Sequence, residues 1–148
     1  MSDLVIRPVR AGDHARWRSL WHGYRDFYRA AQSDEVDAML WAALLANDGE
    51  IRGLVADRGE GAIGLVHYVF HKSTWSLKPI CYLQDLFVSK QDRGGGAAKA
   101  LMQACFDDAR AQGAFRVYWQ TQEYNGAARS LYDTLTPRSS FIVYRKEL

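Results

Sequence analysis

The stretch QDRGGGAAKAL, residues 91–101, decides the fold because it joins a predicted strand to a predicted helix through three consecutive glycines. The strand is the apolar run YLQDLFV, residues 82–88, and the helix begins at AAKALMQA, residues 97–104. Glycine loses more backbone freedom on folding than any other residue, so three of them in a row are costly. We therefore expect the glycines to serve a purpose that side chains would prevent.

A glycine-rich start of a helix suits an anion, and a phosphate group in particular. The free N–H groups of a helix start attract anions, and Arg93 adds a fixed positive charge with several donors. The alternative is a flexible loop that is merely rich in glycine. Two common phosphate motifs do not fit, because Lys99 lies between alanines instead of in Gly-Lys-Ser/Thr and also occupies the third glycine position of a dinucleotide fingerprint.

Hydrophobic periodicity predicts the element order β-α-α-β-β-β-α-β-α-β. Apolar spacings of three and four predict helices over residues 13–28, 33–47, 97–113 and 125–135. Short apolar runs predict strands over residues 4–9, 51–57, 62–70, 80–88, 115–121 and 141–148. Elements that alternate in this way favour a mixed sheet with helices on its faces.

Length and composition narrow the class of protein. A chain of 148 residues favours one domain, residues 1–148. A net charge of +2 without a basic run gives no reason to expect nucleic acid, and no segment has the apolar length of a membrane span. The N-terminus lacks an apolar signal core. Two cysteines without CxxC spacing predict reduced thiols and a cytoplasmic location.

A third pattern fits the glycine stretch. Residues 93–98 match R/Q-x-x-G-x-G/A, and they resemble the pyrophosphate-binding signature of the GNAT superfamily of acetyl-CoA-dependent N-acetyltransferases. The segment YLQDLFVSKQDRGGGAAKALMQA resembles the strand, loop and helix that hold coenzyme A in that family. YNGAARSLYDTL resembles its later Asn…Leu-Tyr helix. The resemblance covers nearly the whole chain, and within the family it is closest to the polyamine and small-amine acetyltransferases.

This resemblance implies an α/β (α+β) GNAT fold, with a mixed, mostly antiparallel central sheet flanked by helices on both faces. It implies transfer of an acetyl group from acetyl-CoA, with no metal, to a primary amine of a small molecule or basic peptide by direct attack in a ternary complex. It also implies a homodimer paired through C-terminal strands. Cofactor binding falls by resemblance on Phe87, Val88, Arg93, Gly94, Gly95, Gly96, Ala97, Ala98, Asn125 and Tyr132.

The catalytic residues also follow from the resemblance. Tyr132 matches the family tyrosine that protonates the leaving thiolate, although its helical spacing would also suit a core residue. In the polyamine enzymes a glutamate precedes the strand aspartate, whereas this chain has Gln84, which cannot act as a base. Asp85 remains, but strand alternation sends it to the opposite sheet face from Gln84. Glu123 or Tyr82 is a further candidate, acting through water.

Acidic and aromatic groups could select a cationic amine. The candidates for substrate binding are Trp21, Tyr24, Asp26, Glu35, Tyr82 and Gln84. For each of them a core or solvated-surface role is equally compatible with the sequence. His67 and His71 share a strand face without a third ligand, so we expect no metal site. Two other functions stay open: a non-catalytic acyl-CoA-binding regulatory domain, and an interaction domain in which the loop binds nothing.

Overall fold

The computed structural model describes residues 3–148, and a five-stranded sheet lies at its centre. The strands follow one another in the order β1-β2-β3-β4-β5, and only the β4–β5 pair is parallel. Their bounds are β1 Val5–Arg7, β2 Ile51–Asp57, β3 Ala62–His71, β4 Ile80–Val88 and β5 Val117–Tyr118. The mixed, mostly antiparallel sheet expected from the sequence is therefore confirmed.

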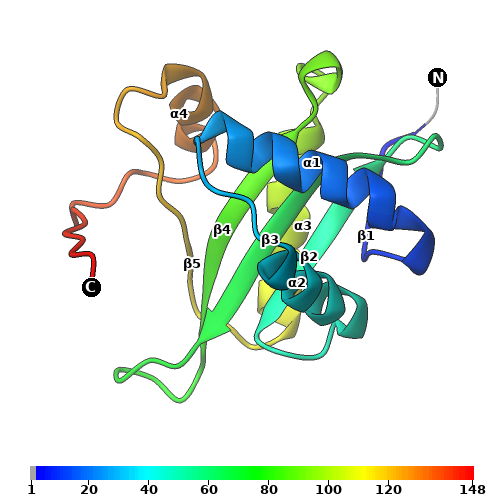
Figure 1. The fold of residues 1–148 in the computed structure, drawn as a ribbon. Helices are drawn as coiled ribbons and strands as arrows, with labels where there is room; N and C mark the ends of the chain where they lie inside the picture. Colours follow the sequence, from blue (N-terminus) through cyan, green and yellow to red (C-terminus); the bar gives the residue numbers. More distant parts are fainter. Residues whose placement is uncertain (1–2) are drawn as a thin grey trace.

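Helices cover both faces of this sheet (Figure 1). Helices α1 and α2 lie on one face, α3 lies on the other, and α4 lies near the end of β4 where β5 departs. Their bounds are α1 His14–Phe27, α2 Asp34–Ala46, α3 Ala97–Ala111 and α4 Gly126–Asp133, with short 3-10 turns η1 Ala11–Asp13 and η2 Lys90–Asp92. The four helices predicted from periodicity are all present.

Each face has its own hydrophobic core, which explains the apolar periodicity of the helices. Between α1, α2 and the sheet the core contains Trp17, Trp21, Leu40, Leu44 and Leu65. Between α3 and the sheet it contains Tyr68, Cys81, Leu101, Met102 and Cys105. Burial of apolar area on both faces is the main force that stabilises such a three-layer arrangement.

Strand β4 contains a bulge that corrects one expectation from the sequence. His67 pairs with Asp85 and the next residue of β3, Tyr68, pairs with Leu83, so Gln84 is the extra residue. A bulge of this kind breaks the simple alternation of side chains. Leu83 packs in the core under α3, whereas Asp85 lies on the α1 side beside His67. The strict alternation assumed from the sequence therefore does not hold across Gln84, because Leu83 and Asp85 lie on opposite sides of the sheet.

The expectation of a C-terminal strand over residues 141–148 is also wrong. These residues form neither helix nor strand, and Phe141, Ile142, Val143 and Tyr144 are all exposed. The preceding strand is shorter than expected as well, because β5 comprises only Val117–Tyr118. A strand requires a neighbouring edge with which to pair, and the chain carries this apolar segment away from the sheet (Figure 1).

A cation held by two carboxylates fixes the N-terminal strand. Arg7 donates to Asp13 Oδ2 at 2.7 Å and to Asp57 Oδ2 at 2.8 Å, and all three side chains are largely buried. Hydrogen bonds from Arg7 are the main reason that the pKa of Asp13 and the pKa of Asp57 lie below their usual range. The network joins β1 to η1 and to the end of β2.

Candidate active site

The glycine loop, residues 91–98, has a backbone that requires glycine at two positions. Gly94 and Gly96 have φ values of +85° and +86°, a region that residues with a Cβ rarely adopt. A Cβ built on either would meet no heavy atom within 4 Å, so the backbone faces open space. Gly96 is the N-cap of α3, whose first N–H groups have no partner inside the helix. The loop is therefore an open cradle of backbone donors.

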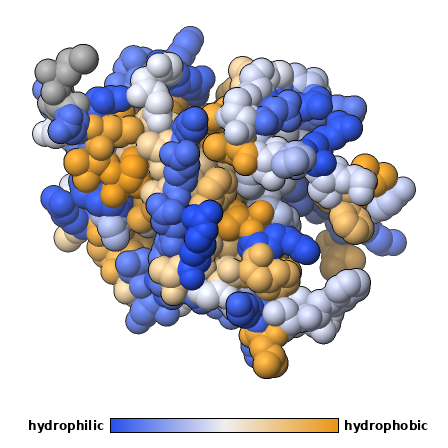
Figure 2. Space-filling view, turned by 180° about the vertical axis from the view of Figure 1, so that it is seen from behind, coloured by the Kyte–Doolittle hydropathy of each residue, from blue (hydrophilic) through white to orange (hydrophobic). Residues whose placement is uncertain are grey.

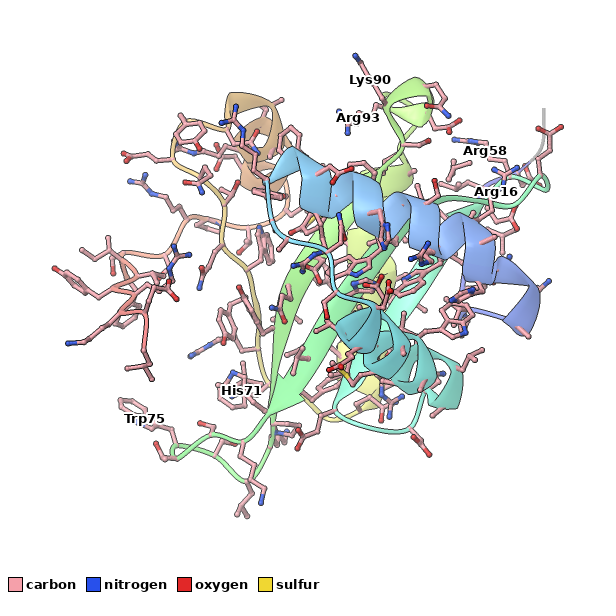
Figure 3. The ribbon with its side chains drawn as sticks, in the orientation of Figure 1. Arg16, Arg58, His71, Trp75, Lys90 and Arg93 are labelled. Atoms are coloured by element: carbon pink, nitrogen blue, oxygen red, sulfur yellow. The ribbon has the colours of Figure 1, made fainter. Side chains whose placement is uncertain are left out.

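Positive side chains surround this cradle (Figure 3). Arg93 donates through Nε to the Val88 carbonyl at 3.0 Å, and its guanidinium lies 5.5 Å from the Phe87 ring centroid. Arg58, from the β2–β3 turn, donates to the Gly95 carbonyl at 2.8 Å. Lys90 precedes the loop and is exposed. Bare donors, left-handed glycines and fixed cations are what a pyrophosphate group needs, so these residues fit coenzyme A.

Sequence reasoning did not find Arg58. The stretch RGEG at residues 58–61 indicated only a hairpin turn, and it does form that turn between β2 and β3. Nothing in the local sequence shows that this turn reaches the glycine loop, because the two segments are far apart in the chain and meet only through the sheet.

Next to the loop, β4 offers backbone groups on a free edge. Within residues 3–148, its partner on this side is β5, and the two strands pair only at Cys81 and Tyr82. Phe87 and Val88, which were predicted to bind the cofactor, lie beyond that pairing and are held from the other side by β3. The strands separate there, so an extended ligand can reach peptide groups of β4.

Asp85 lies on the same strand, beside His67 of β3 and Tyr24 of α1. Its Oδ2 is 3.1 Å from His67 Nδ1, and His67 Nε2 in turn is 3.0 Å from Trp17 Nε1. The Tyr24 phenol lies beside the same carboxylate: burial is the main cause that raises the pKa of Tyr24, and Asp85 raises it further. Asp85 thus projects among α1, β3 and β4.

Tyr132 brings a second phenol to this place from α4. Burial raises the pKa of Tyr132, with a smaller contribution from Tyr28, and Tyr132 also acts on Tyr24. The rings of Tyr24 and Tyr28 are 5.0 Å apart. We call Tyr24, Tyr28, Asp85 and Tyr132 the acceptor cluster. The raised pKa of Tyr24 and of Tyr132 means that these two phenols keep their protons at neutral pH.

Asn125, predicted to contact the cofactor, is the N-cap of α4. Its side-chain oxygen accepts a hydrogen bond from the Ala128 N–H at 3.3 Å. This cap sets where α4 begins and therefore where Tyr132 lies on the helix. The Tyr132 ring packs edge-on against Trp119, with centroids 5.6 Å apart. The packing against Trp119 agrees with a core role for Tyr132. The same contacts also allow a position near Asp85, beside Tyr24.

The other predicted site residues are spread over the surface and the core. Glu123 is exposed in the turn before α4, and Asp26 and Glu35 are exposed near the ends of α1 and α2. Gln84 is exposed in the bulge. Trp21 is buried and donates to Asp37 Oδ1 at 2.9 Å, so it belongs to the α1–α2 core.

Tyr82 lies farther along β4, at the end of the strand where β5 still pairs with it. Its ring stacks on that of Tyr118, with centroids 4.8 Å apart. Burial is the main cause that raises the pKa of Tyr82, and Tyr118 and then Asp85 contribute less. Among the residues predicted to bind substrate, Tyr24 and Tyr82 are therefore the two whose pKa the charge of Asp85 raises.

No group of three or more His, Cys, Asp and Glu side chains that could hold a metal ion occurs within residues 3–148. His67 is used inside the core by Trp17 and Asp85, and His71 is exposed and bonded to Tyr118. In the same part of the chain, every helix is too short or too polar to cross a membrane.

Comparison with known proteins agrees with this geometry. The model of the acetyltransferase (GNAT) family matches residues 17–135. A D-amino-acid N-acetyltransferase of Saccharomyces cerevisiae is 28% identical over 145 residues, which cover 97% of this chain and 90% of the relative. An uncharacterized N-acetyltransferase of Bacillus subtilis is 36% identical over 131 residues, or 88% and 87% of the two chains.

The fold also matches a solved structure that contains a coenzyme A conjugate. AAC(6')-Iy in complex with the bisubstrate analogue CoA-S-monomethyl-acetylneamine superposes with a TM-score of 0.81, at 20% identity, over 99% of this chain and all (100%) of the other. The family match covers most of the chain and includes the glycine loop and the acceptor cluster. The chain therefore belongs to the GNAT family of acetyltransferases, which take their acetyl group from acetyl-CoA.

Proposed function

We propose that this acetyltransferase transfers the acetyl group to a primary amine of a small molecule or basic peptide, by direct attack in a ternary complex. One observation carries the proposal: the Asp85 carboxylate and the Tyr24 phenol lie side by side, with Tyr132 close to Tyr24, next to the free edge of β4 that leads into the glycine loop. A proton acceptor and a proton donor thus lie next to a surface suited to an extended thioester.

The glycine loop and the free strand edge would hold acetyl-CoA. Arg93 and the N–H groups at the start of α3 would bind the pyrophosphate, and Arg58 would keep the loop in place through its bond to Gly95. Peptide groups near Phe87 and Val88 would bind the pantetheine arm. A peptide N–H of this edge would polarise the thioester carbonyl as negative charge develops on its oxygen.

Asp85 would accept a proton from the substrate amine, and Tyr132 would donate one to the leaving thiolate. An alkylammonium has a pKa of about 10, so the substrate must lose a proton before its nitrogen can attack. Asp85 accepts that proton, directly or through water, with exposed Glu123 as a second candidate. The nitrogen then forms a bond to the carbonyl carbon and the carbon–sulfur bond breaks. Tyr132 gives its proton to the sulfur, and the proton released from the new amide nitrogen replaces it through solvent.

The bulge at Gln84 bears on the choice of amine. The polyamine enzymes that the sequence resembles have a glutamate at this position, and here an exposed amide takes its place. The yeast relative is named for D-amino acids. Asp85 provides one negative charge beside the aromatic rings of Tyr24, Tyr28 and Tyr82, which suits a substrate with one ammonium group close to an apolar or polar body.

The test is the release of thiol from acetyl-CoA in the presence of a panel of amines. The panel contains D-amino acids, lysine and its analogues, spermidine, aminoglycosides and a basic peptide. We expect release with at least one of them. If acetyl-CoA binds and no amine causes release, the chain is the regulatory acyl-CoA-binding domain that the Gln84 departure keeps open. If acetyl-CoA does not bind, both functions are wrong.

We also infer that two copies pair through their C-terminal segments. The side chains of residues 141–144 are apolar and exposed, β5 is an edge strand of two residues, and a hollow of about 240 Å³ lies beside it. Phe106, Phe115, Trp119 and Leu135 line that hollow. Figure 2 shows apolar patches among hydrophilic side chains on this rear face of the molecule. The apolar segment of a second copy suits this surface, since its four consecutive apolar side chains are exposed.

Sedimentation of the full chain tests the pairing. We expect a dimer for the wild type and a monomer for Ile142→Asp, because a charge would be buried in the interface. A matched change at an exposed position away from this segment, Val5→Asp, should leave the dimer intact. A wild-type monomer at micromolar concentration would contradict the inference.

A further inference from the structure

His67 is a buried polar residue that the reaction described above does not use. It is 2% exposed, and its ring lies between Trp17, Trp21 and the sheet. The ring of Trp21 meets it edge-on, with centroids 5.0 Å apart. On β2, Gly53 leaves room for it, because a Cβ there would lie 3.1 Å from His67 Cδ2. The imidazole is therefore fixed in one orientation.

The two hydrogen bonds of this ring determine its tautomer. The indole N–H of Trp17 can only donate, and it is 3.0 Å from His67 Nε2. Nε2 must therefore accept, and the single proton of the neutral ring lies on Nδ1. That N–H points to Asp85 Oδ2 at 3.1 Å.

We propose that His67 is a positioning residue for the proton acceptor: Trp17 fixes its tautomer, and its Nδ1–H holds the Asp85 carboxylate toward the acceptor cluster. The inference rests on the proposed function. A carboxylate can accept about four hydrogen bonds, so one bond from His67 leaves capacity for the ammonium of a substrate. An arginine in this place would make the carboxylate a weaker base, because its positive charge favours the ionised form. The neutral imidazole orients the carboxylate without that charge.

The other groups around Asp85 support this assignment. Tyr24 from α1 and Tyr82 from β4 lie close enough to Asp85 for its charge to raise the pKa of their phenols, and Tyr28 and Tyr132 adjoin Tyr24. Arg25, on the same helix as Tyr24, lies over the Trp21 ring at 5.4 Å from its centroid. Among the groups named here, His67 is thus the one that both contacts Asp85 and is itself held by a second hydrogen bond.

The first experiment needs no turnover. Long-range ¹H–¹⁵N NMR of the labelled full chain reports which imidazole nitrogen carries the proton. We expect His67 to carry its proton at Nδ1, because the Trp17 N–H leaves Nε2 as the acceptor. A proton on Nε2 would overturn the proposal.

The second experiment compares two tryptophan variants in the same aromatic cluster. Trp17→Phe removes the N–H that fixes Nε2, whereas Trp41→Phe trims a ring that packs at a tilt against Trp17, with centroids 5.0 Å apart. In Trp17→Phe, the proton of the His67 ring can move to Nε2 and the bond to Asp85 is then lost, so kcat/KM for the amine should fall. The KM for acetyl-CoA should not change, and Trp41→Phe should keep the wild-type kcat/KM.

Removal of the ring itself gives the magnitude. We expect His67→Ala to lower kcat by about 10²-fold, the loss that misplacement of a catalytic group can cause, and His67→Asn to recover part of it by supplying an N–H donor. Equal kcat/KM values for Trp17→Phe and Trp41→Phe would overturn the proposal. If no amine is turned over at all, the proposed function fails, while the NMR result still decides the tautomer.

Discussion

The glycine loop follows β4, and the acceptor cluster surrounds Asp85 on that strand. The two regions are built from different parts of the chain. The loop is a backbone feature: left-handed glycines at 94 and 96, followed by the free N–H groups of α3. The acceptor cluster consists of side chains from α1, β4 and α4, oriented by a histidine on β3. The first is encoded locally, and the second exists only after the sheet has formed.

This contrast predicts that the two regions can be damaged separately. Changes in the loop should weaken acetyl-CoA binding, whereas changes in the acceptor cluster should slow turnover of bound acetyl-CoA. A variant of one region that produced the effect assigned to the other would show that the division is wrong.

The largest effect is expected for Asp85→Asn. The amide has nearly the same shape but cannot accept the proton of the amine, so kcat should fall about 10²–10⁴-fold. Acetyl-CoA affinity, measured by calorimetry, should stay within error of the wild type. Asp48→Asn, at an exposed position after α2, is the matched control and should retain full turnover. A fully active Asp85→Asn protein would move the base elsewhere, with Glu123 as the next candidate.

The next largest effect concerns Asp13 and Asp57, which Arg7 holds by ion pairs, whereas Asp85 is bonded to a histidine. Arg7→Met leaves Asp13 and Asp57 buried without their partner, and we expect a loss of about 3–5 kcal/mol in the free energy of unfolding at pH 7. Because Arg7 lowers the pKa of both carboxyls, its stabilisation is present above about pH 4 and is lost as pH falls through the lowered values.

Urea unfolding at several pH values measures this effect. The difference between the wild type and Arg7→Met should be largest near neutral pH and should shrink below about pH 4. A difference that grew on acidification would contradict the assignment of the network. Acetyl-CoA affinity of the folded variant should be unchanged, since the network is outside the loop.

Tyr132→Phe should have a smaller effect on the chemical step. Loss of the phenol removes the proton donor of the thiolate, so we expect kcat to fall about 10²-fold with little change in acetyl-CoA affinity. Tyr124→Phe, at an exposed position just before α4, serves as control. A Tyr132→Phe protein that lost cofactor binding instead would place this ring in the binding region.

The smallest of these effects is expected in the loop. Gly96→Val forces a β-branched residue to φ +86°, a strain of about 1–3 kcal/mol, and we expect acetyl-CoA to bind about tenfold more weakly. Gly113→Val introduces the same strain after the other end of α3, where φ is +82°, and should affect stability without affecting affinity. Unchanged affinity in Gly96→Val would disprove the assignment of the loop.

Much of the fold could be predicted from the sequence because its signals are local. Residues 91–101 show the loop and the start of α3 through glycine and apolar spacing alone, and the aromatic stripe from Trp17 to Tyr24 indicates α1. The GNAT resemblance rests on these same stretches. Phe87 and Val88 lie at the free edge of β4 and the glycines at the start of α3, and their part in cofactor binding stays a prediction.

The remaining features depend on pairing between distant segments. The bulge at Gln84 is visible only in the register of β4 against β3, so strict alternation could not describe this part of the strand. The sequence indicated no partner for His67, and its bonds to Trp17 and Asp85 appear only when α1, β3 and β4 pack together. The apolar residues 141–144 have the pattern of a strand, but a strand also needs an edge, and this chain leaves them exposed.

The most direct measurement is amine-dependent thiol release by the wild type and Asp85→Asn, side by side, with acetyl-CoA at the same measured occupancy. Our account predicts release by the wild type with at least one amine, and a fall of about 10²-fold or more in the variant at equal occupancy. Equal release by the two proteins, or none by the wild type although acetyl-CoA is bound, would contradict the assignment of Asp85 as the proton acceptor of an acetyltransferase site.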